Sequence, residues 1–183
     1  MPDLTDAHRK TLLTTARQSI AGVLAGQAPD WRAEAFDDVL RRPAGAFVTL
    51  KTHEGDLRGC IGSIQAVQPL FQAVASSAIA AAFRDPRFPP LHAGELEVLT
   101  LEISVMGPIE VVSDIEDIVV GRDGLIISKG RNSGLLLQQV ASEYGWDRRA
   151  FLEHTCGKAG LSRDAWRADD CRIEKFSAVV FGE

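Results

Sequence analysis

The spacing of apolar positions predicts two main helices in the first half of the chain. Over residues 5–25, apolar side chains recur at helical spacing, and Gly26 stands where such a helix would end. Residues 69–84 show the same spacing with many alanines, which predicts a thin helix able to pack closely on a sheet. A connector over 27–33 and one short turn over 36–40 separate the first helix from the rest.

Alternating and β-branched positions predict the strands. Residues 46–50 and 57–64 form a hairpin around a turn at 53–56, so Cys60 is expected within the return strand. Residues 99–105 alternate apolar with polar side chains, which is the pattern of a strand with one buried face.

The second half of the chain predicts shorter elements. A short strand is expected at 111–112, and a second hairpin is expected from 118–120 and 125–128 around the turn at 121–124. A flexible loop, two helices and a closing strand follow, at 130–134, 136–144, 147–158 and 173–181. Helices and hairpins alternate without a regular β-α-β period, which favours an α+β fold with a largely antiparallel sheet.

Composition narrows the class of protein. The chain has 183 residues, of which 45% are hydrophobic and 25% charged, as in a soluble protein with one domain or one core plus a small lobe. No apolar run is long enough to span a membrane, and the charged first twenty residues contain no secretory signal, so the cytoplasm is the expected compartment. The net charge of −5 disfavours a nucleic-acid partner.

The three cysteines, Cys60, Cys156 and Cys171, are an odd number and show no Cys-x-x-Cys spacing. Such a set predicts free thiols rather than a disulfide framework or a structural zinc site. We expect neither a metal nor a cofactor.

Residues 57–62 read Leu-Arg-Gly-Cys-Ile-Gly, the most informative run in the chain. In an extended strand Arg58, Cys60 and Gly62 share one side. Glycine weakens a strand interior, so Gly59 and Gly62 indicate that something approaches the backbone closely. An arginine on the same side would favour the reactive thiolate of Cys60. The alternative is that Cys60 is a small buried apolar side chain, as most free cysteines are.

A second informative run is Arg-Asp-Pro-Arg-Phe-Pro-Pro at 84–90, which prolines exclude from a helix. Arg84 and Arg87 beside Asp85, on a stiff loop at a helix end, suit recognition of a carboxylate or phosphate. The alternative is a rigid structural turn in which Asp85 pairs with one of its arginines.

Other candidate chemistry is weaker. His154 and Cys156 lie two positions apart on a predicted helix, so they do not face each other and cannot form a local chelate. Cys156 fits an apolar stripe and is expected in the core. His154 is a candidate general base, with a surface or capping histidine as the alternative. The loop at 130–134 lacks the order of a phosphate-binding loop and is expected to be a connector.

Four runs together resemble one family in sequence and order: 57–62, 84–90, Gly-Leu-Leu-Leu at 134–137 and Phe-Leu-Glu-His-Thr-Cys at 151–156. They resemble the AMMECR domain family, whose prokaryotic members are called AmmeMemoRadiSam system protein A. The resemblance runs from about Gly45 to Phe181. It implies an α/β protein with a larger and a smaller lobe, a cleft between them near the six-residue run, and a Memo-type protein and a radical-SAM enzyme as partners.

Two functional hypotheses follow. The first is an accessory protein of a multi-protein system that binds a partner protein or a small anionic ligand, but neither nucleic acid nor membrane. Its binding residues would be Arg58, Gly59, Cys60, Gly62, Arg84, Asp85 and Arg87. The second is an enzyme with Cys60 as nucleophile, Arg58 favouring the thiolate, and His154 or His53 as general base.

Overall fold

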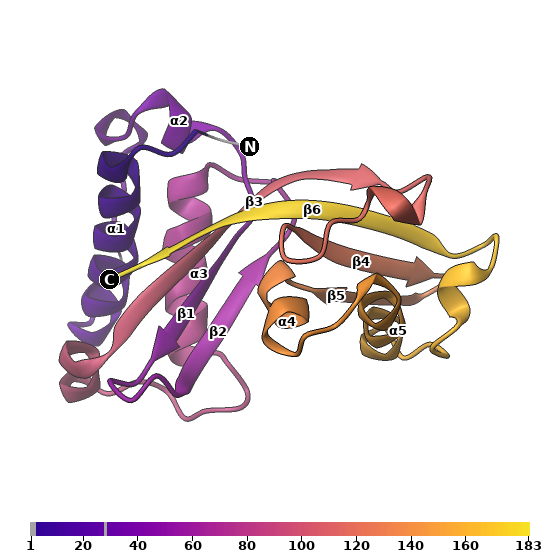
Figure 1. The fold of residues 1–183 in the computed structure, drawn as a ribbon. Helices are drawn as coiled ribbons and strands as arrows, with labels where there is room; N and C mark the ends of the chain where they lie inside the picture. Colours follow the sequence, from indigo (N-terminus) through magenta and orange to yellow (C-terminus); the bar gives the residue numbers. More distant parts are fainter. Residues whose placement is uncertain (1–2, 28) are drawn as a thin grey trace. The chain divides into compact units, whose positions relative to one another are not determined.

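The computed structural model describes residues 3–27 and 29–183, and its elements alternate along the chain as Figure 1 shows. Met1, Pro2 and Ala28, the last within the expected connector, lie outside the described residues. The chain divides into two compact units. The larger unit holds the described residues up to Met106 together with Val179–Glu183, and the smaller unit is Gly107–Ala178.

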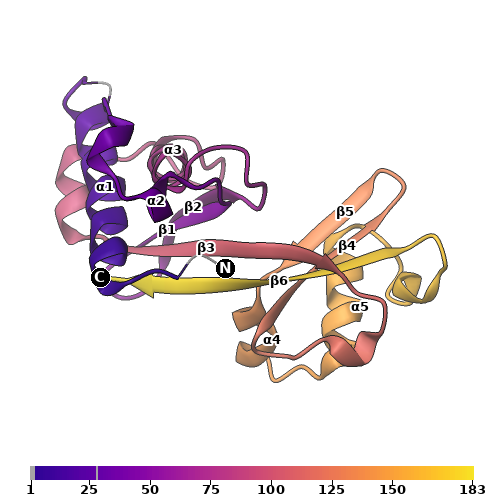
Figure 2. The same cartoon turned by 90° about the horizontal axis from the view of Figure 1, so that it is seen from above.

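The larger unit is built on a three-strand antiparallel arrangement with β1 (Ala46–Lys51) in the middle. β2 (Leu57–Ser63) and β3 (Thr100–Val111) pair with its two edges. The helices α1 (Asp6–Leu24) and α3 (Leu70–Phe83) lie on the same side of these strands (Figure 2). A short helix α2 (Asp38–Arg41) precedes β1.

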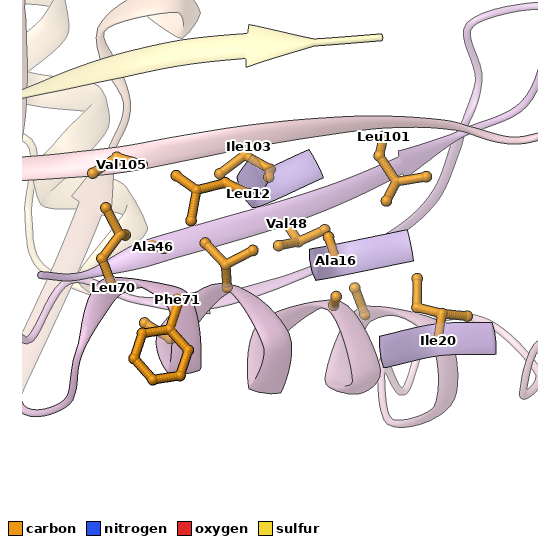
Figure 3. Packing of buried hydrophobic residues seen from close by; sticks show 14 of the residues in the cluster. Leu12, Ala16, Ile20, Ala46, Val48, Leu70, Phe71, Leu101, Ile103 and Val105 are labelled. Atoms are coloured by element: carbon orange, nitrogen blue, oxygen red, sulfur yellow. The ribbon is translucent and has the colours of Figure 1, made fainter. Parts of the chain in front are cut away.

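The core of the larger unit forms where the apolar stripe of each helix meets one face of the strands. Along β1, Ala46, Val48 and Leu50 are buried while the residues between them are half-exposed. Figure 3 shows Ala46 and Val48 among side chains of both helices and of β3. The best buried members of this cluster include Leu12, Ile20, Val48, Leu70, Phe71, Leu101 and Ile103.

The ends of α1 follow from its sequence. The Thr5 hydroxyl accepts a hydrogen bond from the His8 amide, and the His8 ring accepts one from the Thr5 amide, which forms a capping box. The helix stops before Gly26, whose φ of 71° is the left-handed conformation that glycine adopts freely.

The smaller unit places β4 (Asp123–Lys129) between β5 (Asn132–Leu136) and β6 (Arg172–Gly182), again antiparallel. The helices α4 (Gln138–Glu143) and α5 (Arg148–Lys158) follow β5. The core of this unit centres on Ile118, Leu125, Ile127, Phe151, Leu152 and Cys156, all fully buried. Within the part of the chain that is described, six strands run in the order β2-β1-β3-β6-β4-β5, and β3 and β6 contribute residues to both units.

The predicted α+β class with an antiparallel sheet is therefore confirmed, and the elements expected before residue 85 lie within one or two residues of their expected bounds. The strand expected at 99–105 runs on to Val111 as β3, so the separate short strand expected at 111–112 is wrong. Two further predictions in the second half are also wrong. Residues 118–120 are not a strand, because the Val119 amide and carbonyl bond to Asp123 in a turn that leads into β4. The hairpin partner of β4 is instead β5, which occupies most of the loop expected at 130–134.

Glycine explains why β5 looked like a loop. The turn between β4 and β5 contains Gly130 with a φ of 60°. A Cβ on Gly134 would lie 2.3 Å from the amide nitrogen of Ala159, at the end of α5. Gly134 is thus a strand residue at which another backbone packs too closely for any side chain.

A glycine in a strand also allows α3 to pack closely on the sheet of the larger unit. A Cβ on Gly59 in β2 would lie 2.2 Å from the carbonyl oxygen of Ala81 in α3. The alanine-rich helix and the glycine in the strand together allow backbone-to-backbone packing. The close approach inferred from the glycines of the six-residue run is therefore made, at Gly59, by the chain's own helix.

We predict that Gly59→Ala destabilises the larger unit by about 1–3 kcal/mol, the usual cost of overpacking a tight contact. The measurement is the free energy of unfolding from denaturant titration. Gly94→Ala is the matched control, because no atom lies within 4 Å of a Cβ built there and its φ is not in the left-handed region. Equal midpoints for Gly59→Ala and the unmodified chain would contradict the close packing of α3 on β2.

Candidate functional site

The backbone of β2 is irregular at the arginine of the six-residue run. Leu57 and Gly59 pair with the adjacent residues Lys51 and Leu50 of β1, so Arg58 is the extra residue of a β-bulge. A bulge redirects the side chain that it carries. The regular alternation that put Arg58 and Cys60 on one side of the strand is interrupted at this point.

Arg58 is held by a carboxylate from another segment. Its Nε and Nη2 donate to the two oxygens of Glu95 at 2.9 and 3.2 Å, and its side chain is only 11% exposed. Glu95 lies in a 3₁₀ helix (Ala93–Val98), and hydrogen bonding to Arg58 lowers the pKa of its carboxyl. The remaining nitrogen, Nη1, is buried and has no hydrogen-bond partner among the described residues.

Cys60 is half-exposed and pairs with Thr49 across the hairpin. The Thr49 hydroxyl donates to Cys60 Sγ at 3.2 Å. Position 60 is thus not the buried apolar site of the alternative reading. That description fits Cys156, which is fully buried as expected. A Cβ on the neighbouring Gly62 would lie 2.3 Å from the Ala46 carbonyl oxygen, so this glycine serves the hairpin itself.

Asp85 joins the two informative runs of the sequence. Its buried carboxylate accepts the Cys60 amide at 2.9 Å and the Arg87 amide at 3.1 Å. The Arg87 guanidinium adds bonds of 2.9 Å from Nε and 2.7 Å from Nη2. These hydrogen bonds, led by those from Arg87, hold the pKa of Asp85 far below its usual range despite burial. The Asp85–arginine pair named in the alternative, a rigid structural turn, is therefore present, while recognition of an anion by this loop stays a prediction.

Arg87 completes a loop of contacts around Cys60. Its Nη2 also donates to the Cys60 carbonyl oxygen at 3.3 Å, and its side chain remains 53% exposed. The guanidinium carbons of Arg87 and Arg58 lie 5.5 and 5.9 Å from the centre of the Phe88 ring. Arg84, at the end of α3, is exposed and forms no ion pair with any residue that the structure describes.

We name the group of Arg58, Cys60, Asp85, Arg87, Phe88 and Glu95, together with Arg84, which precedes Asp85 in the chain but has no contact with the others among those described, the arginine–cysteine surface. All its members belong to the larger unit. Sequence reasoning placed five of them at the site and missed Phe88 and Glu95, as well as Thr49. The register of the predicted hairpin is the one signal that would have found Thr49, since it sets Thr49 opposite Cys60.

The two candidate general bases, His53 and His154, form no described hydrogen bond or ion pair with members of the arginine–cysteine surface. His53 is exposed in the turn between β1 and β2. His154 belongs to the smaller unit, where its ring stacks on Trp146 with 3.8 Å between centres, and Trp146 stacks in turn on Tyr144. A role for either histidine as general base stays a prediction, as does the cleft between the lobes.

Over residues 3–27 and 29–183, no three His, Cys, Asp or Glu side chains are grouped so that they could hold a metal ion. In the same residues, no helix combines the length and apolar character needed to cross a membrane.

Comparison with known proteins identifies relatives along nearly the whole chain. The family model AMMECR1 matches residues 13–181, a wider range than the resemblance suggested. A protein of Methanocaldococcus jannaschii is 42% identical over 175 residues, covering 92% of this chain and 86% of the relative. A protein of Thermococcus onnurineus is 47% identical over 187 residues, covering 97% and 91%. The crystal structure of a Pyrococcus horikoshii protein matches with a TM-score of 0.86 and 40% identity, covering 94% of this chain and 90% of that one.

We predict that iodoacetamide modifies Cys60 first among the three thiols. Cys156 is fully buried, and burial raises the pKa of both Cys156 and Cys171. Labelling of Cys156 needs local opening, and an opening cost above about 1.4 kcal/mol slows the reaction more than tenfold. Peptide mass spectrometry over a time course measures the three rates. Equal rates in the folded chain would contradict the exposure of Cys60.

We predict that Asp85→Asn lowers the free energy of unfolding by about 2 kcal/mol at neutral pH, because it breaks charge-assisted bonds in a buried site. Folding lowers the pKa of Asp85. The stabilisation that its charged carboxylate provides is therefore complete above the unfolded-state pKa of about 4 and is lost as the pH falls below that value. The difference between the two chains should therefore shrink in acid.

Denaturant titrations at several pH values measure this difference. Asp170→Asn is the matched control, because the Asp170 carboxylate also pairs with a cation, Lys129, but is 70% exposed and should contribute little. A difference that stays constant from neutral to strongly acidic pH would show that the charge of Asp85 is not what stabilises the loop.

Proposed function

Because the chain belongs to the AMMECR1 family, we propose that it acts as an accessory binding protein that takes a carboxylate at the arginine–cysteine surface. The carboxylate belongs either to a small ligand or to a side chain of a partner protein. Binding, rather than hydrolysis or metal chemistry, is the function that the contacts around Cys60 support best.

The observation that carries the proposal is the unpaired nitrogen of Arg58. Nη1 is buried without a partner among the described residues, and a buried donor left in that state costs about 1–3 kcal/mol. Glu95 already occupies the other edge of the guanidinium. A carboxylate oxygen bound at Nη1 would satisfy the donor and gain a charge-assisted hydrogen bond.

The charges of the surface favour a single negative charge. Arg58 and Arg87 are each paired with one carboxylate, Glu95 and Asp85, and Arg84 has none within the described residues. Three guanidinium groups and two carboxylates leave a net charge of +1. A monoanion such as a carboxylate is complementary to this value, whereas a phosphate dianion would exceed it.

The surface is also rigid, which suits binding. Asp85 and Arg87 fix the backbone of Cys60, and Glu95 fixes Arg58. A site held in place before its ligand arrives loses less conformational entropy on binding. In the wider proposal the partners are a Memo-type protein and a radical-SAM enzyme, which the family resemblance supports.

One observation supports the alternative of an enzyme. The Thr49 hydroxyl fixes the position of the Cys60 sulfur, and the thiol is half-exposed, as a nucleophile requires. In this alternative His154 or His53 takes the thiol proton, the Cys60 sulfur forms a bond to an electrophilic carbon of the substrate, and the bond from that carbon to its leaving group breaks as the leaving group takes up the proton.

The binding proposal predicts saturable changes in the amide NMR signals of Cys60 and Arg87 when acetate is added to the full chain at constant ionic strength. Acetamide, which has the same shape without the charge, should produce no saturable change. Arg84→Gln, a substitution of an exposed side chain, should weaken acetate binding by about tenfold, or about 1.4 kcal/mol. Arg131→Gln is the control, because Arg131 is exposed in the smaller unit. Equal responses to acetate and acetamide would refute the proposal.

Cys60→Ser distinguishes binding from catalysis, since serine keeps the approximate size of the side chain and removes the thiol. We expect the substituted chain to bind a purified Memo-type protein from the same organism with unchanged affinity, and to restore the phenotype of a deletion strain. Binding without restoration of the phenotype would favour the enzyme instead.

A further inference from the structure

A hollow lies in the smaller unit and shares no residue with the arginine–cysteine surface. It has a volume of about 310 Å³ and is lined by residues from β3, from the start of β4 and from β6. All of its lining residues fall within Gly107–Ala178. This volume is at the lower end of the range for small-molecule sites.

Four charged side chains surround the hollow, and two of them neutralise each other. Asp123 is buried and accepts from Arg122 Nε and Nη2 at 2.7 and 2.8 Å, and from the Val119 amide at 2.9 Å. This pair is part of the turn that leads into β4. It supplies a fixed wall with no net charge.

The other two charges are left without ionic partners. Lys175 donates to the carbonyl oxygen of Asp117 at 3.1 Å but forms no ion pair with any described residue. Glu110 is exposed and, within the same residues, forms neither an ion pair nor a side-chain hydrogen bond. Its charge contributes to raising the pKa of Arg122, after the larger contributions of Asp123, so it lies close to the guanidinium.

We infer that this hollow binds a free α-amino acid. Its carboxylate pairs with Lys175, and its ammonium group pairs with Glu110. A simple anion would leave Glu110 unpaired and repelled, and a simple cation would do the same to Lys175. A ligand that carries both charges satisfies both side chains.

The size of the hollow supports the same class. A nucleotide or a folded partner needs a larger contact area than a cavity at the lower end of the usual range offers. Pro108 adds apolar wall, which suits the side chain of the amino acid. The Ser177 hydroxyl lies on the same strand as Lys175, two positions along, and is available to hydrogen-bond the carboxylate.

The test is a calorimetric titration of the full chain with leucine, glutamine and alanine. Leucinamide and N-acetylleucine serve as matched probes, because each lacks one of the two charges. We expect at least one amino acid to bind, and each blocked form of leucine to bind at least about tenfold more weakly than leucine, or about 1.4 kcal/mol. Lys175→Gln and Glu110→Gln should each weaken amino-acid binding by a similar factor, and Arg131→Gln should leave it unchanged.

Three results would overturn the inference: no binding of any of the three amino acids, equal binding of N-acetylleucine and leucine, or unchanged binding in Glu110→Gln. Thermal unfolding of each variant checks that it is folded. Because the hollow and the arginine–cysteine surface share no residue, failure here would leave the proposed carboxylate site untouched.

Discussion

The buried carboxylate of Asp85 is the interaction on which the candidate site depends. It binds the amide of Cys60 on one side and the amide and guanidinium of Arg87 on the other, and so ties the proline-rich loop to the strand that carries the thiol. Charged groups are buried only when they are paired and hydrogen-bonded, and Asp85 meets both conditions. Without Asp85, the hydrogen bond from Arg87 to the Cys60 carbonyl oxygen would be the one bond described between the loop after α3 and β2.

Close packing of backbones is the second constraint, and it recurs in both units. Gly59 lets α3 approach β2, and Gly134 lets α5 approach β5. In each case the strand residue has no side chain, and backbone atoms of the helix or of its end fill that space and contact the strand directly. The glycines of the six-residue run therefore serve packing, while the arginine, the thiol and the loop are left to make contacts of their own.

Much of this was accessible from the sequence, because local patterns determine it. The period of the apolar positions located α1 and α3, and alternation located β1, β2 and β3. One exception is β5, where Ser133 and Gly134 favour a loop by local preference, and only the packing of α5 reveals a strand. Five residues of the candidate site and the possible Asp85–arginine pair could be named from the sequence, whereas Phe88, Glu95 and Thr49 could not. The bulge at Arg58 and the choice of Glu95 as its partner depend on contacts between distant segments, which no local pattern encodes.

The contacts that locate Cys60 are made to its main chain. Asp85 accepts a hydrogen bond from the Cys60 N–H, and Arg87 donates one to the Cys60 C=O. Among the bonds described, the sulfur itself accepts only from the Thr49 hydroxyl. Placement and reactivity are thus separate properties of this position, because neither of the two bonds that fix its backbone involves the sulfur. A residue other than proline, of similar size, could replace the thiol there and keep both main-chain bonds.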